Sequence, residues 1–338
     1  MAHVMNVLPL DDPYIGSIEW GGYVWTNNDV FRDPVTIGYF LSNDVSTWTT
    51  IEGNAVAAAL QSWSNVANIS FVQVGNAIDA DLIEHSVPGS MLDGDYGEHG
   101  TPKHAFQTTD QYDDSILLGG NTYAHGYFNF ESFGWDYNDP NGGLNVGGNG
   151  YWTLIHELGH GLGLAHPHDD GGGSTIFPGV TDTWVTGDNG LNQGIWTVMS
   201  YIATDGPASA NTNHTGGALW YDSSGNAVGN YGYFAGPMAY DIAAIQDLYG
   251  ANSNFHNGGD TYWLPDQNAL GTYWTCIWDT GGNDSIAYGG SRSVTINLTA
   301  ATLDNSPTGG GVISSANGIH GGYTIANGVV IELSLIHI

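Results

Sequence analysis

Apolar positions recur with a helical period in one early segment of the chain. Between residues 53 and 68, Val56, Leu60, Trp63 and Ala67 fall three or four positions apart. Residues at this spacing share one face of an α-helix, because the helix repeats every 3.6 residues. The pattern therefore predicts an amphipathic helix over 53–68, with its apolar stripe turned toward a core.

Segments of β-prone character lie on both sides of this helix. Residues 35–41 alternate with aromatic side chains, and residues 69–74, 80–84 and 123–130 are also strand-like. A further helix is predicted over 237–249, where apolar residues again follow helical spacing. Strands interleaved with helices in this order predict a mixed sheet with helices packed on it, which is an α+β fold.

The most informative stretch is His-Glu-Leu-Gly-His-Gly-Leu-Gly-Leu-Ala-His, which begins at His156 and ends at His166. If the stretch is helical, His156 and His160 lie about one turn apart and both imidazoles can reach one metal ion. Glu157 then points beside the metal and suits a general base acting on a metal-bound water. Gly163 allows the backbone to turn, so that His166 can return as a third ligand.

A chance match on an amphipathic helix is the alternative for a bare HExxH motif. The additional Gly163 and His166 at the required spacing argue against it. Gly159, Gly161 and Gly163 each weaken a helix by up to about 1 kcal/mol relative to alanine. Something other than helix propensity must hold this segment, and metal ligation is the obvious candidate.

This pattern resembles the metzincin metalloproteases, and the resemblance extends beyond the helix. Met199, followed by Ser200 and Tyr201, lies at a distance typical of the family's methionine-containing turn. The Pro167-His168 pair after the third histidine and the stretch 241–252 are similar to the serralysin branch. The similarity runs from about residue 20 to residue 332.

The resemblance implies a metzincin-type catalytic domain, with a mixed twisted sheet, long helices and a zinc cleft, followed by the beginning of a β-rich calcium-binding domain. Residues 1–19 are expected to be a lead-in or pro-segment, 20–252 the catalytic domain, and 253–332 part of the serralysin C-terminal domain. Residues 333–338 correspond to the translation of a widely used sequencing adapter. We expect them to be a read-through artefact.

The activity implied by the resemblance is that of a secreted, extracellular zinc endopeptidase, acting on proteins or peptides through a zinc-activated water. One zinc ion is expected at the catalytic site, and one or more calcium ions are expected as structural ions. The catalytic residues implied are His156, His160 and His166 as zinc ligands, Glu157 as general base, Tyr201 as an additional zinc ligand and oxyanion donor, and Met199 as the apolar floor.

Two further sets of residues follow from matching the family stretch by stretch. The glycine- and aspartate-rich run 281–286 resembles half of a calcium-binding repeat. The implied calcium ligands are Asn257, Gly259, Thr261, Asp279, Gly281, Asp284 and Glu332. The strand expected to pair with the substrate backbone consists of Gly126, Tyr127, Phe128, Asn129 and Phe130.

The remaining histidines of the polar regions are expected to have no ligand role. His99 and His104 show no metal-ligand spacing, so they are predicted to be solvated loop residues. His168 and Asp169 are predicted to support the zinc site or a calcium ion rather than bind zinc, because three histidines already fill the protein side of the zinc site.

The charge balance excludes several classes of partner. Three basic residues, Arg32, Lys103 and Arg292, stand against 34 acidic ones, which gives a formal net charge of −31. Nucleic acid and anionic membranes are therefore unsuitable partners. The lone Cys276 allows no intrachain disulfide, and the chain is expected to be a monomer.

Two functions from other classes stay open. The chain could be a non-catalytic module that binds peptides or polysaccharide on the metzincin fold, or a calcium-dependent adhesive surface protein. The intact Glu157 argues against the first, since a binding module does not need a general base. Protease activity that depends on zinc would separate both from an endopeptidase.

Overall fold

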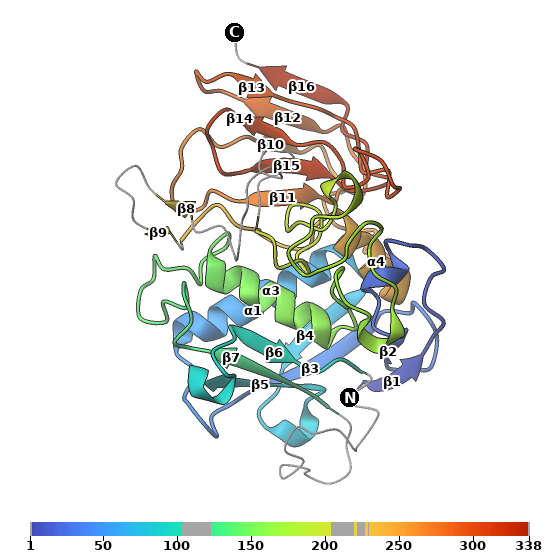
Figure 1. The fold of residues 1–338 in the computed structure, drawn as a ribbon, viewed down its shortest axis with the longest axis vertical. Coiled ribbons are helices and arrows are strands. Elements are labelled where there is room, and N and C mark those ends of the chain that lie inside the picture. Colours follow the sequence, from blue (N-terminus) through green and yellow to red (C-terminus); the bar gives the residue numbers. More distant parts are fainter. Residues whose placement is uncertain (1, 103–122, 204–219, 222–226, 229, 337–338) are drawn as a thin grey trace.

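The computed structural model describes residues 2–102, 123–203, 220–221, 227–228 and 230–336. Lys103 and His104 lie outside these residues. In Figure 1, the part of the chain that contains helices α1 (Thr50–Val66) and α3 (Asn149–Gly161) lies below a stack of strands formed by the C-terminal segment. No helix in the described residues is long and apolar enough to cross a membrane.

A five-stranded mixed sheet supports the helices. Its order is β4-β3-β5-β7-β6, with every pair parallel except β6 and β7. Helices α1 and α3 pack against the sheet and against each other (Figure 1), which confirms the α+β arrangement that the sequence predicts. The elements are β3 (Val35–Ser42), α1 (Thr50–Val66), β4 (Ile69–Gln73), β5 (Leu82–Val87), β6 (Gly97–His99), β7 (Ala124–Asn129) and α3 (Asn149–Gly161).

Helix α1 begins three residues before the predicted start because of its N-terminal cap. The Thr49 side chain accepts a hydrogen bond from the Glu52 amide at 3.2 Å, and the Glu52 carboxylate accepts one from the Thr49 amide at 2.7 Å. The other Glu52 oxygen accepts a hydrogen bond from the Trp135 indole at 2.8 Å. The same carboxylate therefore starts the helix and anchors the loop that leads to α3.

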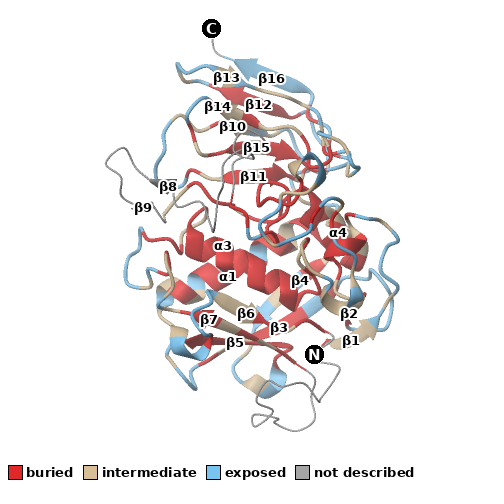
Figure 2. Cartoon of the chain, viewed as in Figure 1, coloured by how far each residue is buried: buried red, intermediate tan, exposed pale blue. Residues whose placement is uncertain are grey.

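Helix α3 lies in the middle of the molecule, and all of its residues are buried (Figure 2). Two of its glycines permit this close packing. A Cβ atom at Gly159 would lie 2.8 Å from the Met199 sulfur, and one at Gly161 would lie 2.6 Å from the His99 ring. The glycines that weaken the helix locally are thus required by what packs against it.

The segment after α3 leads through a short hairpin and helix α4 to β-structure. The chain beyond residue 252 forms only strands and loops within the described residues, in a four-stranded sheet of order β11-β15-β14-β13 and a parallel sheet of order β10-β12-β16. The elements are β8 (Trp220–Tyr221), β9 (Ala227–Val228), α4 (Ala239–Tyr249), β10 (Thr261–Trp263), β11 (Trp274–Ile277), β12 (Ser285–Tyr288), β13 (Val294–Thr295), β14 (Ser314–Ala316), β15 (Gly322–Ile325) and β16 (Leu333–Ile336).

Strands β13 and β16 are the outermost strands of these two sheets in the described residues. Strand β13 has two residues and pairs with β14. The stretch expected to be a read-through artefact forms β16 and pairs in parallel with β12. All four residues of β16 are exposed, so this pairing rests on backbone hydrogen bonds rather than on core packing.

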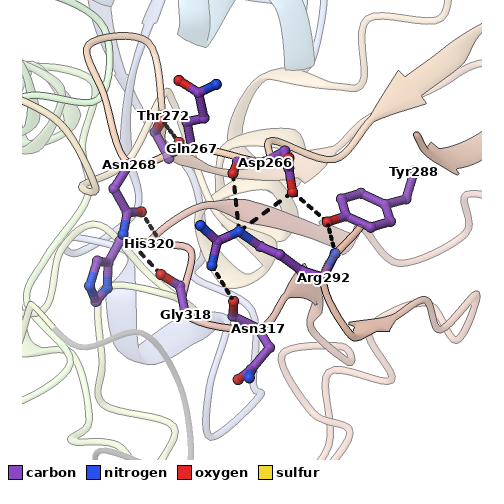
Figure 3. A network of polar contacts seen from close by, with 9 residues as sticks. All are labelled: Asp266, Gln267, Asn268, Thr272, Tyr288, Arg292, Asn317, Gly318 and His320. Carbon is purple, nitrogen blue, oxygen red and sulfur yellow. Dashed lines mark hydrogen bonds and ion pairs between the residues drawn. The ribbon is translucent and has the colours of Figure 1, made fainter. Parts of the chain in front are cut away.

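Arg292 ties three loops of the C-terminal part together (Figure 3). Its guanidinium group donates to the Asp266 carbonyl at 3.2 Å and to the Asn317 carbonyl at 3.4 Å, and its backbone amide donates to the Tyr288 hydroxyl at 2.9 Å. Arg32 forms an ion pair with Asp247 of α4. Because Nε of Arg292 also lies 3.5 Å from the Asp266 carboxylate, both arginines of the described residues are paired with carboxylates.

The N-terminal segment is built into the fold. Strand β1 (His3–Asn6) pairs antiparallel with β2 (Tyr23–Thr26), and the Trp20 amide donates to the Gly163 carbonyl at 2.7 Å. Glu19 is fully buried between these contacts, and it accepts a hydrogen bond from the Leu10 amide at 2.9 Å. The segment thus runs beside the turn that follows α3.

Glu19 is expected to make stability depend on pH. Burial raises the pKa of its carboxyl from 4.5 to about 8, and the nearby Asp247 carboxylate adds to the shift. Because the folded chain holds this proton more tightly than the unfolded chain, the stabilisation is complete below about pH 4.5 and is lost as the pH rises through about 8. We expect the free energy of unfolding to fall by up to about 5 kcal/mol between these limits.

The check is urea unfolding at several pH values for the wild type and for Glu19→Gln, whose amide does not ionise. The difference between the two curves isolates Glu19 from other titrating groups. The wild type should lose more stability than the variant as the pH rises. Parallel pH profiles would show that Glu19 is already ionised in the folded chain.

Candidate metal centre and cleft

Three imidazoles converge at the C-terminal end of α3. His156 and His160 project from successive turns of the helix, and Gly163, with φ at +104°, reverses the chain so that His166 returns to them. The His166 Nε2 atom lies 3.2 Å from Nε2 of His156 and 3.0 Å from Nε2 of His160. The predicted ligand set is therefore brought together in space.

The other ring nitrogens fix the orientation of all three imidazoles. Nδ1 of His156 donates to the Val198 carbonyl at 2.8 Å, and Nδ1 of His160 donates to the Leu164 carbonyl at 2.8 Å. Nδ1 of His166 donates to the Asp169 carboxylate at 2.6 Å. With the protons placed on Nδ1, all three Nε2 lone pairs face one point.

This donor set fits a zinc ion. Three lone pairs held together repel one another unless a cation lies between them, and tetrahedral Zn–N bonds place two nitrogens about 3.3 Å apart. Burial and the neighbouring His166 lower the pKa of His156 to about 3, and the same causes lower the pKa of His160 well below its usual range. The His156 and His160 rings are therefore neutral, as metal ligation requires.

Asp241 of α4 holds the methionine turn beneath these rings. Its carboxylate accepts hydrogen bonds from the Thr197 hydroxyl at 2.6 Å, the Val198 amide at 2.7 Å and the Met238 amide at 2.8 Å. Met199 is fully buried and packs against α3 at Gly159. The carboxylate thereby positions the same Val198 peptide whose carbonyl orients His156.

Glu157 faces a pocket of about 580 Å³ beside the three histidines. Burial raises the pKa of its carboxyl to about 8; nearby His99 lowers it, and Glu98 and Asp95 add negative charge. The pocket is lined by Gly94, Asp95, Tyr96, Gly97, Phe133, Asn149, Trp152, Thr153, His156, Glu157, Trp184, Tyr201 and Tyr233. Residues 2–19 belong to the segment that we expect to be a lead-in or pro-segment, and none of them lines this pocket.

Tyr201 lies at the edge of both the pocket and the histidine cluster. Its ring centroid is 4.8 Å from that of His166 and 5.4 Å from that of His156. The side chain is 39% exposed, so it has room to move. Burial and the nearby Glu157 carboxylate raise the pKa of the phenol above its usual range, which keeps it protonated and able to donate a hydrogen bond.

The prediction that residues 126–130 form the substrate-binding edge does not agree with the topology. Strand β7 pairs with β5 on one side and with β6 on the other, so its backbone groups are already engaged. Strand β6 is the edge of the sheet, and a Cβ atom at Gly97 would lie 2.7 Å from Glu157 Cγ. Among the described strands, the outermost one beside Glu157 is therefore β6, one strand further out than predicted.

The prediction that His99 is solvated is wrong. The side chain is buried behind α3, its Nε2 lies 3.3 Å from a Glu84 oxygen, and its Nδ1 lies 2.7 Å from the Gly100 carbonyl. Burial alone would lower the pKa of His99, but the Glu84 carboxylate raises it. Gly126 and Gly161 leave the space that His99 and Glu84 occupy. The two residues come from different segments, so the local sequence pattern does not predict that they pair.

Several predicted calcium ligands lie together. Asp279 and Asp284 are buried, and one Asp284 oxygen has no partner among the described residues. The Glu332 carboxylate accepts a hydrogen bond from the Asp284 amide at 2.7 Å. His256 and Asp260 form a potential metal-binding group with Asp279. The sequence analysis did not predict either of these two residues as a ligand.

The other predicted calcium ligands are Asn257, Gly259, Thr261 and Gly281. The Asp260 amide donates a hydrogen bond to the Asp284 carboxylate at 2.7 Å. Gly259 and Thr261, the residues on either side of Asp260, therefore lie near this site. Gly281 has φ at +141°, a conformation that favours glycine. The ligand role of Asn257 stays a prediction.

Comparison with known proteins identifies relatives of this chain. Residues 25–181 match the matrixin family. Metallopeptidase AprA of Pseudomonas marginalis is 31% identical over 82% of this chain and 50% of its own length. Serralysin of Photorhabdus luminescens is 28% identical over 86% and 51%, and serralysin C of Dickeya chrysanthemi is 32% identical over 81% and 49%. The chain spans about half the length of these curated relatives.

A solved structure, that of myroilysin, is similar at a TM-score of 0.33 and 18% identity, over 65% of this chain and 95% of that one; this score is too low to bear on the fold. The sequence relatives are more informative, since their alignments extend over most of the chain. The matrixin match also includes α3 and the three clustered histidines. The chain is thus a serralysin-like metzincin, with its matrixin match at residues 25–181.

Proposed function

We propose that this chain is the catalytic part of a secreted zinc endopeptidase, with residues 20–252 as the catalytic domain. The observation that carries the proposal is the convergence of three oriented Nε2 atoms next to a pocket that also contains Glu157. The serralysin relatives support a hydrolase of this class. Proteins or peptides are then the substrates.

The residues around the metal position have different roles in the proposed peptide hydrolysis. Zinc held by His156, His160 and His166 would lower the pKa of a water molecule and polarise the scissile carbonyl. Glu157 accepts the proton from that water and passes it to the leaving amine. Tyr201 would serve as an additional zinc ligand in the resting state, and after swinging away it would donate a hydrogen bond to the developing oxyanion.

Strand β6 offers the substrate a backbone edge. Because β7 occupies its other side, β6 can add an extended peptide only on the side that faces the cleft. Gly97 brings this edge directly against Glu157, since any larger side chain would collide with the carboxylate. A peptide paired there passes the general base in an extended form.

Residues 253–332 are proposed to be the beginning of a calcium-binding C-terminal domain. The buried Asp279 and Asp284, with Glu332 beside them, gather negative charge that a hard cation would neutralise. Secretion and a monomeric state are part of the same proposal. The part of this chain that aligns with the serralysin relatives covers about half of their length, and the proposal concerns that part alone.

The test is hydrolysis of casein by the purified chain in calcium, followed by mass spectrometry of the new peptide ends. Removal of the metal with 1,10-phenanthroline and dialysis should abolish hydrolysis, and one equivalent of zinc should restore it. Peptide binding without cleavage by the zinc-loaded chain would instead favour the non-catalytic binding module. Calcium-dependent surface adhesion without cleavage would favour the adhesive protein.

A further inference from the structure

The pocket beside Glu157 has walls that the hydrolytic chemistry does not require. Six of its thirteen lining residues are tryptophan, tyrosine or phenylalanine, and they come from six separate places along the chain. Trp152 stacks on Tyr233 with ring centroids 5.8 Å apart, which fixes the inner wall. Trp184 is 46% exposed and Tyr96 is 43% exposed, so aromatic faces are also presented to whatever enters.

Besides Glu157, one other acidic residue lines this pocket. Asp95 lies in the turn before β6, and its side chain is exposed. No lysine or arginine is among the described residues that form the lining. The two arginines that the structure describes are held elsewhere, Arg32 by Asp247 and Arg292 by Asp266.

Aromatic faces with a carboxylate are the combination that binds organic cations. A guanidinium or ammonium group is attracted to the face of a tryptophan or tyrosine ring, and more strongly if a carboxylate completes the contact. The long stems of arginine and lysine can also bury their methylene groups along aromatic walls. A substrate carboxylate would meet repulsion from Asp95 and from Glu98, which lies three residues further on, in β6.

We propose that this pocket accepts an arginine or lysine side chain of the peptide substrate, with Asp95 facing the cation and the aromatic rings packing on its stem. The inference rests on the proposed peptidase function and names the substrate class of that site. Arginine should be preferred over lysine, because its planar guanidinium stacks on aromatic rings and binds a carboxylate through two hydrogen bonds. Asp95 is then a specificity-determining residue.

The experiment uses matched fluorogenic peptides that differ at one position on either side of the scissile bond. That position carries arginine, lysine, citrulline, leucine or glutamate. Citrulline has nearly the shape of arginine but no charge, so the arginine-to-citrulline ratio of kcat/KM isolates the cation. We expect a ratio of about tenfold in the wild type at low salt, with glutamate the poorest residue.

Two variants assign the preference to one carboxylate. Asp95→Asn should reduce the arginine-to-citrulline ratio to about twofold or less. Asp93→Asn is the matched control, since Asp93 lies in the same turn, is exposed and does not line the pocket. It should retain the wild-type ratio. Equal loss in both variants would mean that general charge, rather than Asp95, sets the preference, and would overturn the proposal.

A binding measurement separates this inference from the peptidase function. Trp152 and Trp184 line the pocket, so their fluorescence reports occupancy even without turnover. In Glu157→Ala, the arginine peptide should bind about tenfold more tightly than the citrulline peptide. Cleavage of casein with no arginine preference in either assay would overturn the pocket assignment alone. An arginine preference in binding without any cleavage by the zinc-loaded wild type would overturn the peptidase function alone.

Discussion

Replacing Glu157 with glutamine is expected to lower kcat/KM for peptide hydrolysis about 10³-fold, with one zinc ion still bound per chain. Glutamine keeps the size of the side chain in its tight position against Gly97. It cannot accept the proton of the attacking water or deliver one to the leaving amine. The zinc ligands keep their orientation, because the Nδ1 atoms of the three imidazoles bond to Val198, Leu164 and Asp169 rather than to Glu157.

The measurement combines steady-state kinetics with metal analysis of the same preparation. Glu131→Gln is a suitable control, because Glu131 is an exposed carboxylate in the loop after β7 and lies outside the pocket. It should retain activity within about twofold of the wild type. A Glu157→Gln variant that kept more than a tenth of the wild-type rate would assign the proton transfer to another group.

Asp241→Ala is expected to destabilise the fold by about 4 kcal/mol. The substitution leaves the Thr197 hydroxyl and the amides of Val198 and Met238 buried without their common acceptor. Since the Val198 carbonyl orients His156, the zinc affinity should also fall, by about 10- to 100-fold. Stability and metal affinity should therefore decline together.

Urea unfolding and a competitive zinc titration test both parts of this expectation. Asp241→Asn keeps one acceptor oxygen and should lose about half as much stability as the alanine variant. Asp247→Asn, on the same helix, removes an ion pair near the surface and should cost about 1 kcal/mol or less. Loss of stability in Asp241→Ala with an unaltered zinc affinity would show that the methionine turn does not orient His156.

The sequence predicts the centre of the site well because that information is local. His156, Glu157 and His160 lie on one helix, and the glycine at 163 supplies the turn that brings His166 back. The helix 237–249 is also found, as α4 over Ala239–Tyr249. Spacing along the chain is sufficient for such features, since the local backbone geometry alone determines which side chains meet.

The features that the sequence does not predict depend on contacts between distant segments. His99 looks polar and solvated in its own segment, yet Glu84, fifteen positions earlier, gives it a buried partner. Strand β6 has only three residues, too few for a periodic pattern, and it takes the edge position assigned to 126–130. Strand order and buried ion pairs are properties of the assembled sheet, which is why local patterns miss them.

The acceptors of the three Nδ1–H groups differ in how they respond to mutation. Those of His156 and His160 are the carbonyls of Val198 and Leu164, and every amino acid at these two positions supplies a carbonyl. The acceptor of His166 is the side chain of Asp169. Sequence drift can therefore alter the first two positions without removing an orienting bond. At position 169, a single base change in the gene can release the third imidazole.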